Sequence, residues 1–117
     1  MRRSVLIVDD HPSFLAVARY LLETEGFDVV GVAGDGESAV RETVRASPQF
    51  VLLGVTLPDM DGFEVAARLR AAGVSSTIVF TSSRDHTEFG SLVTDSGGAG
   101  FIAKGELSGD ALRVLAA

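Results

Sequence analysis

The sequence contains no cysteine, a single lysine and no long apolar run. Without cysteine there is no disulfide framework, no thiolate metal site and no thiol nucleophile. No run approaches the roughly 20 apolar residues of a membrane span, and the apolar stretch after residues 1–4 is too short for a signal peptide. These absences predict a cytoplasmic protein that makes no contact with membranes.

A surplus of acidic residues limits the partners of the chain. The 117 residues carry a net charge of −6, and the arginines are scattered along the sequence. Because binding to phosphate groups needs a basic face, we expect no direct contact between this domain and nucleic acid. The length is sufficient for one hydrophobic core that needs no disulfide or metal to stabilise it, so we predict a single domain over residues 1–117.

Five short apolar runs recur along the chain and predict buried strands. They cover residues 5–8, 27–33, 50–53, 77–80 and 101–103. The intervals between them have room for a helix and two loops, and helical patterns lie at about 12–25, 36–46, 62–73, 87–94 and 107–116. This alternation predicts an α/β fold, in which helices on both faces flank a doubly wound, five-stranded parallel sheet with right-handed crossovers.

Apolar spacing within the helices predicts which residues face the core. We expect Val17 of the first helix, Val44 of the second and Leu92 of the fourth to be core residues. The fourth helix is expected to be marginal, because residues such as Gly90 and Val93 lower helix propensity.

Two adjacent carboxylates, Asp9 and Asp10, follow the first apolar run directly. In open α/β sheets, ligands bind beyond the carboxyl ends of the strands. Neighbouring carboxylates repel each other there unless a cation such as Mg²⁺ or a lysine lies between them. The single lysine, Lys104, follows the last apolar run. We therefore predict that Lys104 reaches the aspartate pair as an internal counter-ion.

Four segments resemble those of the receiver domains of bacterial response regulators, which act in two-component signalling. They are LIVDDHP at 6–12, VLLGVTLPDMDG at 51–62, TSS at 81–83 and FIAK at 101–104. The resemblance covers essentially the whole chain and implies a flavodoxin-like sheet topology. The Asp-Asp-His-Pro opening is most similar to receivers that precede a helix-turn-helix DNA-binding domain.

The resemblance implies roles for the acidic pair and its surroundings. Asp9, Asp10 and the main-chain carbonyl of Thr56 would hold Mg²⁺, and Lys104 would contact a phosphoryl group. The simpler interpretation of the aspartates is a turn that caps a helix, since aspartate is favoured there. Likewise, an isolated lysine on a loop is normally just solvated.

Two further residues resemble the conformational switch of the family. Thr81 would hydrogen-bond the phosphoryl oxygens, and Phe101 would swing inward when that threonine is engaged. Both residues also have an ordinary structural interpretation. Thr81 can satisfy a backbone group at a strand end, and Phe101 can be a core aromatic residue. The sequence leaves open whether the switch still operates.

The chain departs from the family pattern at Gly54. Family members carry at this position the aspartate that accepts a phosphoryl group from a histidine kinase, and glycine offers no carboxylate. Hence the resemblance implies a receiver that is not phosphorylated at the usual site. We expect it to act through protein contacts, with an output domain, a second copy or a sensor kinase as partner, and not to be an enzyme.

The same change at Gly54 predicts weak or absent Mg²⁺ binding, because a hard-cation site loses affinity with each carboxylate it loses. Two alternatives stay open on sequence alone. The chain could be a small-ligand binder of flavodoxin-like topology, although the acidic pair would repel a phosphate group. It could also be a conventional receiver silenced by an engineered Gly54. A zinc site formed by His11 and His86 is not expected, since the two residues lie on different structural units.

Overall fold

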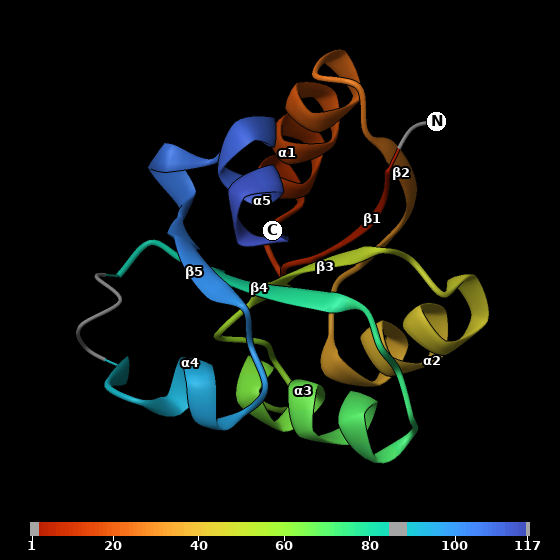
Figure 1. The fold of residues 1–117 in the computed structure, drawn as a ribbon, viewed down its shortest axis with the longest axis vertical. Coiled ribbons are helices and arrows are strands. Elements are labelled where there is room, and N and C mark those ends of the chain that lie inside the picture. The colour runs from red at the N-terminus through yellow and green to blue at the C-terminus, as the bar shows by residue number, and fades with distance from the viewer. Residues whose placement is uncertain (1–2, 85–88, 117) are drawn as a thin grey trace.

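The protein, in a computed structural model that describes residues 3–84 and 89–116, has a central parallel sheet between two layers of helices (Figure 1). The strands are β1 (Ser4–Val8), β2 (Asp28–Ala33), β3 (Phe50–Gly54), β4 (Thr77–Ser82) and β5 (Gly100–Ala103). Their order in the sheet is β2-β1-β3-β4-β5, and every pairing is parallel. The predicted fold class is confirmed.

The helices cover both faces of the sheet, α1 and α5 on one side and α2, α3 and α4 on the other (Figure 1). Their bounds are α1 (Pro12–Thr24), α2 (Gly36–Ala46), α3 (Gly62–Ala71), α4 (Leu92–Asp95) and α5 (Gly109–Leu115). No helix in the described part of the chain is both long and apolar enough to cross a membrane.

Residues 5–8 of β1, 50–53 of β3 and 78–80 of β4 are all apolar, because helices cover both faces of these middle strands. In β1, Leu6 and Val8 belong to the core beneath α2 and α3, whereas Val5 and Ile7 belong to the core beneath α1 and α5. Residues of β3 alternate in the same way, and all five of them are buried. The carboxyl ends of β1, β3 and β4 therefore lie side by side at one edge of the sheet. The polar residues that follow these strands lie at this edge.

The predicted core faces of three helices were wrong in part. Val17 is 63% exposed, Val44 52% and Leu92 49%. Successive residues of a helix turn by about 100°, so an apolar residue beside the buried stripe can still face solvent. In α1 the buried positions are Ala18 and Leu22, and Val17 lies one step to the side of them.

Some element ends also differ from the predictions. β2 begins at Asp28, although the preceding Phe27 is a core residue. α5 begins at Gly109 because the side chain of Ser108 accepts a hydrogen bond from the Ala111 amide and caps the helix. The first residues of the fourth helix predicted at 87–94 lie outside the described residues, and the described helix is Leu92–Asp95. His86 also lies outside the described residues.

The loop after β3 is tied to α2 by Asp59. Its carboxylate accepts hydrogen bonds from the amides of Gly36 (2.7 Å) and Glu37 (3.0 Å), at the N-terminus of α2. The bond from Gly36 is the main reason that the pKa of Asp59 lies below its ordinary value of 3.8. This contact connects the loop that follows Gly54 to the N-terminus of α2.

Replacing Asp59 with asparagine should lower the melting temperature at neutral pH. A carboxylate with a lowered folded-state pKa stabilises the fold above pH 3.8, and this contribution disappears as the pH falls through the folded-state value. Thermal melts from pH 7 down to pH 3 should therefore show the two proteins converging in acid. A constant difference across this range would show that the charge has no part in the contact.

Candidate functional site

The carboxyl ends of β1, β3, β4 and β5 surround a small polar hollow. Strand register places Gly54 beside Thr81, and Thr81 beside Ile102, two residues before Lys104. The hollow has a volume of about 70 Å³, and its lining includes the predicted site residues Asp9, Asp10, Gly54, Thr56, Thr81 and Lys104. The structure therefore brings together six of the seven residues singled out in the sequence, with Phe101 outside the lining.

A larger hollow of about 440 Å³ lies at the opposite ends of the strands, lined by residues such as Gln49, Ser76 and Thr77. Arg3 is the one charged residue in its lining. The hollow next to Asp9 is smaller but combines acids, a lysine and hydroxyls at the end of the sheet where α/β proteins bind ligands. Its chemistry, and not its size, makes it the candidate site.

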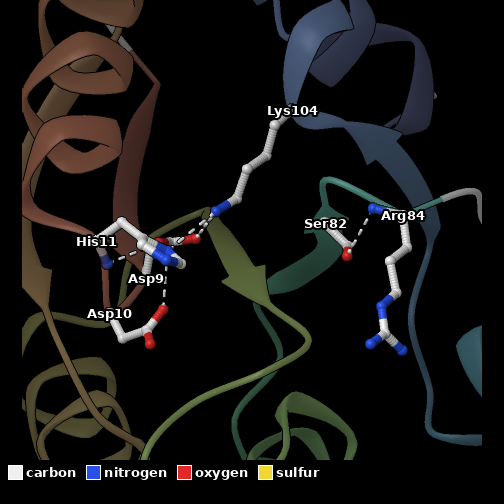
Figure 2. Close-up of polar contacts among 6 residues, drawn as sticks. All are labelled: Asp9, Asp10, His11, Ser82, Arg84 and Lys104. Atoms are coloured by element: carbon white, nitrogen blue, oxygen red, sulfur yellow. Dashed lines mark hydrogen bonds and ion pairs between the residues drawn. The ribbon is translucent and has the colours of Figure 1, made fainter.

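Lys104 reaches across the hollow from the end of β5 to Asp9 (Figure 2). Its Nζ atom lies 2.9 Å from Oδ2 of Asp9. The Asp9 side chain is 2% exposed and that of Lys104 21% exposed, so the ion pair is largely shielded from water. The same ammonium lies 4.6 Å from the centre of the Phe14 ring, a favourable cation–π position. Of the predicted contacts between Lys104 and the acidic pair, the structure shows the one with Asp9.

His11 also joins this cluster, and sequence reasoning did not assign it there. Its Nδ1 atom lies 3.0 Å from Oδ1 of Asp9 and 3.0 Å from Oδ1 of Asp10 (Figure 2). Its main-chain amide donates a hydrogen bond to Asp9 Oδ1 at 2.9 Å. His11 is the N-cap residue of α1. Its position directly after two acids at a helix start was the only available signal.

Gly54 lines the hollow with main-chain atoms alone, because glycine has no side chain. Its backbone is ordinary β-strand, so an L-residue could adopt it. A Cβ atom built there would lie 3.1 Å from the carbonyl oxygen of Val8 and 3.2 Å from Oδ2 of Asp9. The Asp9 carboxylate thus lies against the position where a side chain at residue 54 would begin.

Thr81 is fully buried, and its Oγ1 atom has no hydrogen-bond partner among the described residues. An unpaired buried hydroxyl costs free energy, so its persistence needs an explanation such as a ligand or water in the adjoining hollow. Phe101 is half-buried, packs against the core and has its ring centre 5.8 Å from that of Phe89. Thr56 is exposed at the mouth of the hollow.

The donor set at this site fits Mg²⁺ poorly. Mg²⁺ prefers an octahedron of oxygens that includes carboxylates. Here both oxygens of Asp9 already have cationic or hydrogen-bonding neighbours, and position 54 supplies no carboxylate. Any Mg²⁺ would also lie close to the ammonium of Lys104 and be repelled by it.

Comparison with known proteins decides the family. The family profile described as "Response regulator receiver domain" matches residues 5–115. The chain belongs to this family. It is therefore a receiver domain of two-component signalling, and the small-ligand alternative is set aside.

Several curated and solved proteins are similar to this receiver domain. The Bordetella pertussis virulence-factor transcription regulator BvgA is 35% identical over 106 residues, which are 91% of this chain and 51% of BvgA. The DNA-binding transcriptional activator EvgA of Escherichia coli K12 is 30% identical over 103 residues, or 88% of this chain and 50% of EvgA. The chain thus spans about half the length of the curated relatives that it matches.

The solved receiver domain of the Mycobacterium tuberculosis response regulator NarL has the same fold. It superposes with a TM-score of 0.84 at 30% identity, covering 97% of this chain and 96% of that one. The receiver domain of a modulated diguanylate cyclase from Desulfovibrio desulfuricans G20 gives a TM-score of 0.83 at 35% identity, covering 98% and 90%. Receivers are thus found in proteins with different outputs, so the fold alone does not identify the output of this chain.

Proposed function

We propose that this protein is an atypical receiver domain, which takes no phosphoryl group at residue 54 and acts through phosphorylation-independent contacts with other proteins. The observation that carries the proposal is Gly54 at the end of β3, where there is no carboxylate to attack a phosphodonor. The other residues of the pocket are present, so the scaffold persists without its reactive group.

The Lys104–Asp9 ion pair supports a fixed state of the pocket. In a receiver with three carboxylates, one lysine would have to be shared among them. Here Lys104 is 2.9 Å from Asp9 and 3.5 Å from His11 Nδ1, so its ammonium has a defined partner without any phosphoryl group. The pocket therefore does not need phosphorylation to balance its charges, and the surface around it can be held in one conformation.

The partners of the domain follow from its relatives and its charge. BvgA and EvgA are named as transcription regulators, and each is about twice the length of the matched region. We infer that this receiver acts in the regulation of transcription, with an output domain, a second copy or a sensor kinase as its protein partner. We also infer that the domain makes no direct contact with nucleic acid, because its net charge of −6 repels phosphate groups. We also infer that it is not an enzyme and acts in the cytoplasm.

The proposal is tested with beryllofluoride, which forms a phosphoryl-like group on a carboxylate oxygen. Amide NMR spectra of the protein should be unchanged by beryllofluoride with Mg²⁺, relative to Mg²⁺ alone. The Gly54→Asp variant is the positive control and should show shifts around Thr81 and Phe101. Beryllofluoride-dependent shifts of these residues in the unmodified protein would contradict the proposal, because they would show that the pocket still responds to a phosphoryl mimic.

A further inference from the structure

Two arginines line a small hollow at the amino-terminal edge of the sheet, opposite the edge that carries the acidic pair. Arg3 immediately precedes β1, and Arg113 belongs to α5. The hollow has a volume of about 120 Å³, and Gly26 and Phe27, which lead into β2, complete its described lining. Among the described residues of this lining, the arginines are the only charged ones, although the domain as a whole has a net charge of −6.

Each of the two guanidinium groups lies over an aromatic ring. Cζ of Arg113 is 4.9 Å from the centre of the Phe27 ring, and Cζ of Arg3 is 6.0 Å from the centre of the Phe50 ring. The two rings are in edge-to-face contact, with their centres 5.8 Å apart. A guanidinium group on the face of a ring keeps its N–H groups at its own edges, where they can bind an anion. The pair of rings thus positions two like charges beside one hollow.

Carboxylates of the described residues balance these charges only in part. Arg113 forms an ion pair with Asp110 at 3.0 Å, but the Asp110 side chain is 92% exposed, so the pair contributes little. Glu25 offers Arg113 its main-chain carbonyl, while its carboxylate accepts a hydrogen bond from the Gly109 amide at 2.9 Å. Arg3 has no ion pair with any described residue. Because neighbouring cations repel each other, an anion between the two arginines would stabilise this arrangement.

Arg3 also lines the larger hollow of about 440 Å³ at the same edge of the sheet. The lining there includes the hydroxyl groups of Ser47, Ser75 and Thr77 and the side-chain amide of Gln49. These neutral groups can donate hydrogen bonds to a hydroxylated compound and accept them from it. No carboxylate of a described residue lines either hollow. An anion bound in the smaller hollow would therefore have space beside it for an attached polar group.

We propose that Arg3 and Arg113 form a binding site for a phosphate group, either free phosphate or the phosphate of a small monoester. A guanidinium group matches phosphate geometrically, because two of its N–H groups can bind two phosphate oxygens in parallel. A phosphate monoester carries a charge of about −1.5 to −2 near pH 7, which two arginines balance, whereas a carboxylate carries only one charge.

The net negative charge of the domain does not prevent this binding. Screening limits the reach of exposed charges to about 10 Å at 0.1 M salt, so the two adjacent arginines dominate the interaction with a single phosphate group. The site also lies at the opposite ends of the strands from Gly54. The inference therefore depends on the two arginines and not on how the domain signals.

The test is an amide NMR titration with inorganic phosphate in a zwitterionic buffer, with the ionic strength held constant by sodium chloride. We expect saturable shifts of the Gly26 and Phe27 amides, which line the hollow. Ribose 5-phosphate is titrated in parallel, and the tighter of the two ligands shows whether the site prefers free phosphate or an ester. Ribose without phosphate should leave the Gly26 and Phe27 amides unshifted, because it brings no anion to the arginines.

Substitution of Arg3 tests the residue that has no ion pair. Arg3→Gln should weaken phosphate binding about tenfold or more, because it removes one of two charge-assisted contacts. Arg3→Lys keeps the charge but not the paired N–H groups, so it should weaken binding less than Arg3→Gln. Arg3 is exposed and precedes the first strand, so both variants should fold, and thermal melts verify that they do.

The matched control is Arg68→Gln, which removes a half-exposed arginine from α3 on the other side of the sheet (Figure 1). It should leave phosphate affinity within about twofold of that of the unmodified protein. Equal weakening by Arg3→Gln and Arg68→Gln would overturn the proposal, because it would show a general effect of charge.

The positions of the shifts provide two further ways to overturn the proposal. It fails if neither phosphate nor ribose 5-phosphate gives saturable shifts at Gly26 and Phe27. It also fails if the shifts occur at Thr81 and Lys104 alone, because the anion would then lie at the opposite edge of the sheet. None of these results involves Gly54, so failure here is distinguishable from failure of the proposed signalling role.

Discussion

Replacing Gly54 with aspartate should convert the domain from one that takes no phosphoryl group into one that is phosphorylated by a small-molecule donor such as acetyl phosphate. A carboxylate oxygen at this position would attack phosphorus, acetate would leave, and an acyl phosphate would form on residue 54. The ammonium of Lys104 and the hydroxyl of Thr81 line the same hollow and would face the new group. Intact-mass measurement should show a phosphoryl adduct in Gly54→Asp with Mg²⁺.

The matched control for this change is Gly54→Ala. It adds the same Cβ atom, 3.2 Å from Oδ2 of Asp9, but no carboxylate, so it should fold and take no adduct. Without metal, Gly54→Asp should be less stable than Gly54→Ala, because a third acid joins Asp9 and Asp10. Added Mg²⁺ should raise the melting temperature of Gly54→Asp more than that of Gly54→Ala. If the Gly54→Asp variant folds but is not phosphorylated, the other residues of the pocket no longer support phosphoryl transfer, and the absence of an aspartate at position 54 is not the only change.

Removing the charge of Lys104 should destabilise the fold markedly. In Lys104→Met, the Asp9 carboxylate, whose side chain is 2% exposed, loses its closest cation. Breaking a fully buried pair costs about 3–5 kcal/mol, and the 21% exposure of Lys104 reduces this to about 2 kcal/mol. Methionine keeps the unbranched apolar part of the side chain, so the measured loss in chemical denaturation reports mainly the charge.

An exposed ion pair provides the comparison for Lys104→Met. Arg68 and Glu64 on α3 are 3.0 Å apart, nearly the same separation, but both side chains are about half exposed. Arg68→Met should therefore cost no more than about 0.5 kcal/mol. The double variant Asp9→Asn/Lys104→Met should recover part of the loss, because it leaves no unpaired charge. Equal effects of Lys104→Met and Arg68→Met would show that the internal counter-ion contributes nothing to stability.

The central strands and the position of the site could be predicted from the sequence, because each depends on a local pattern. Residues 5–8 of β1 and 50–53 of β3 are all apolar, and acids follow β1 directly. Strands of a parallel sheet end at the same edge, so residues that follow β1, β3, β4 and β5 had to meet there. Lys104 is the only lysine in the sequence, so it was the only side-chain ammonium group that could be predicted to lie beside the aspartates.

Other features depend on contacts between distant parts of the chain. The bonds from Gly36 and Glu37 to Asp59 join the start of α2 to a loop more than 20 residues away, and no local pattern marks them. Val17 was assigned to the core because apolar spacing gives the general face of a helix but not the edge of the buried stripe. The part of His11 in the acidic cluster depends on the orientation of its ring relative to two carboxylates, which its position alone does not fix.

The most direct test of the central claim uses the protein with Gly54 in place. It is incubated with acetyl phosphate and Mg²⁺, and its intact mass is measured, with Gly54→Asp treated in parallel. The proposed function predicts no phosphoryl adduct on the unmodified chain. An adduct that maps to Asp9, Asp10 or Asp59 would contradict it, because the domain would then have a different acceptor.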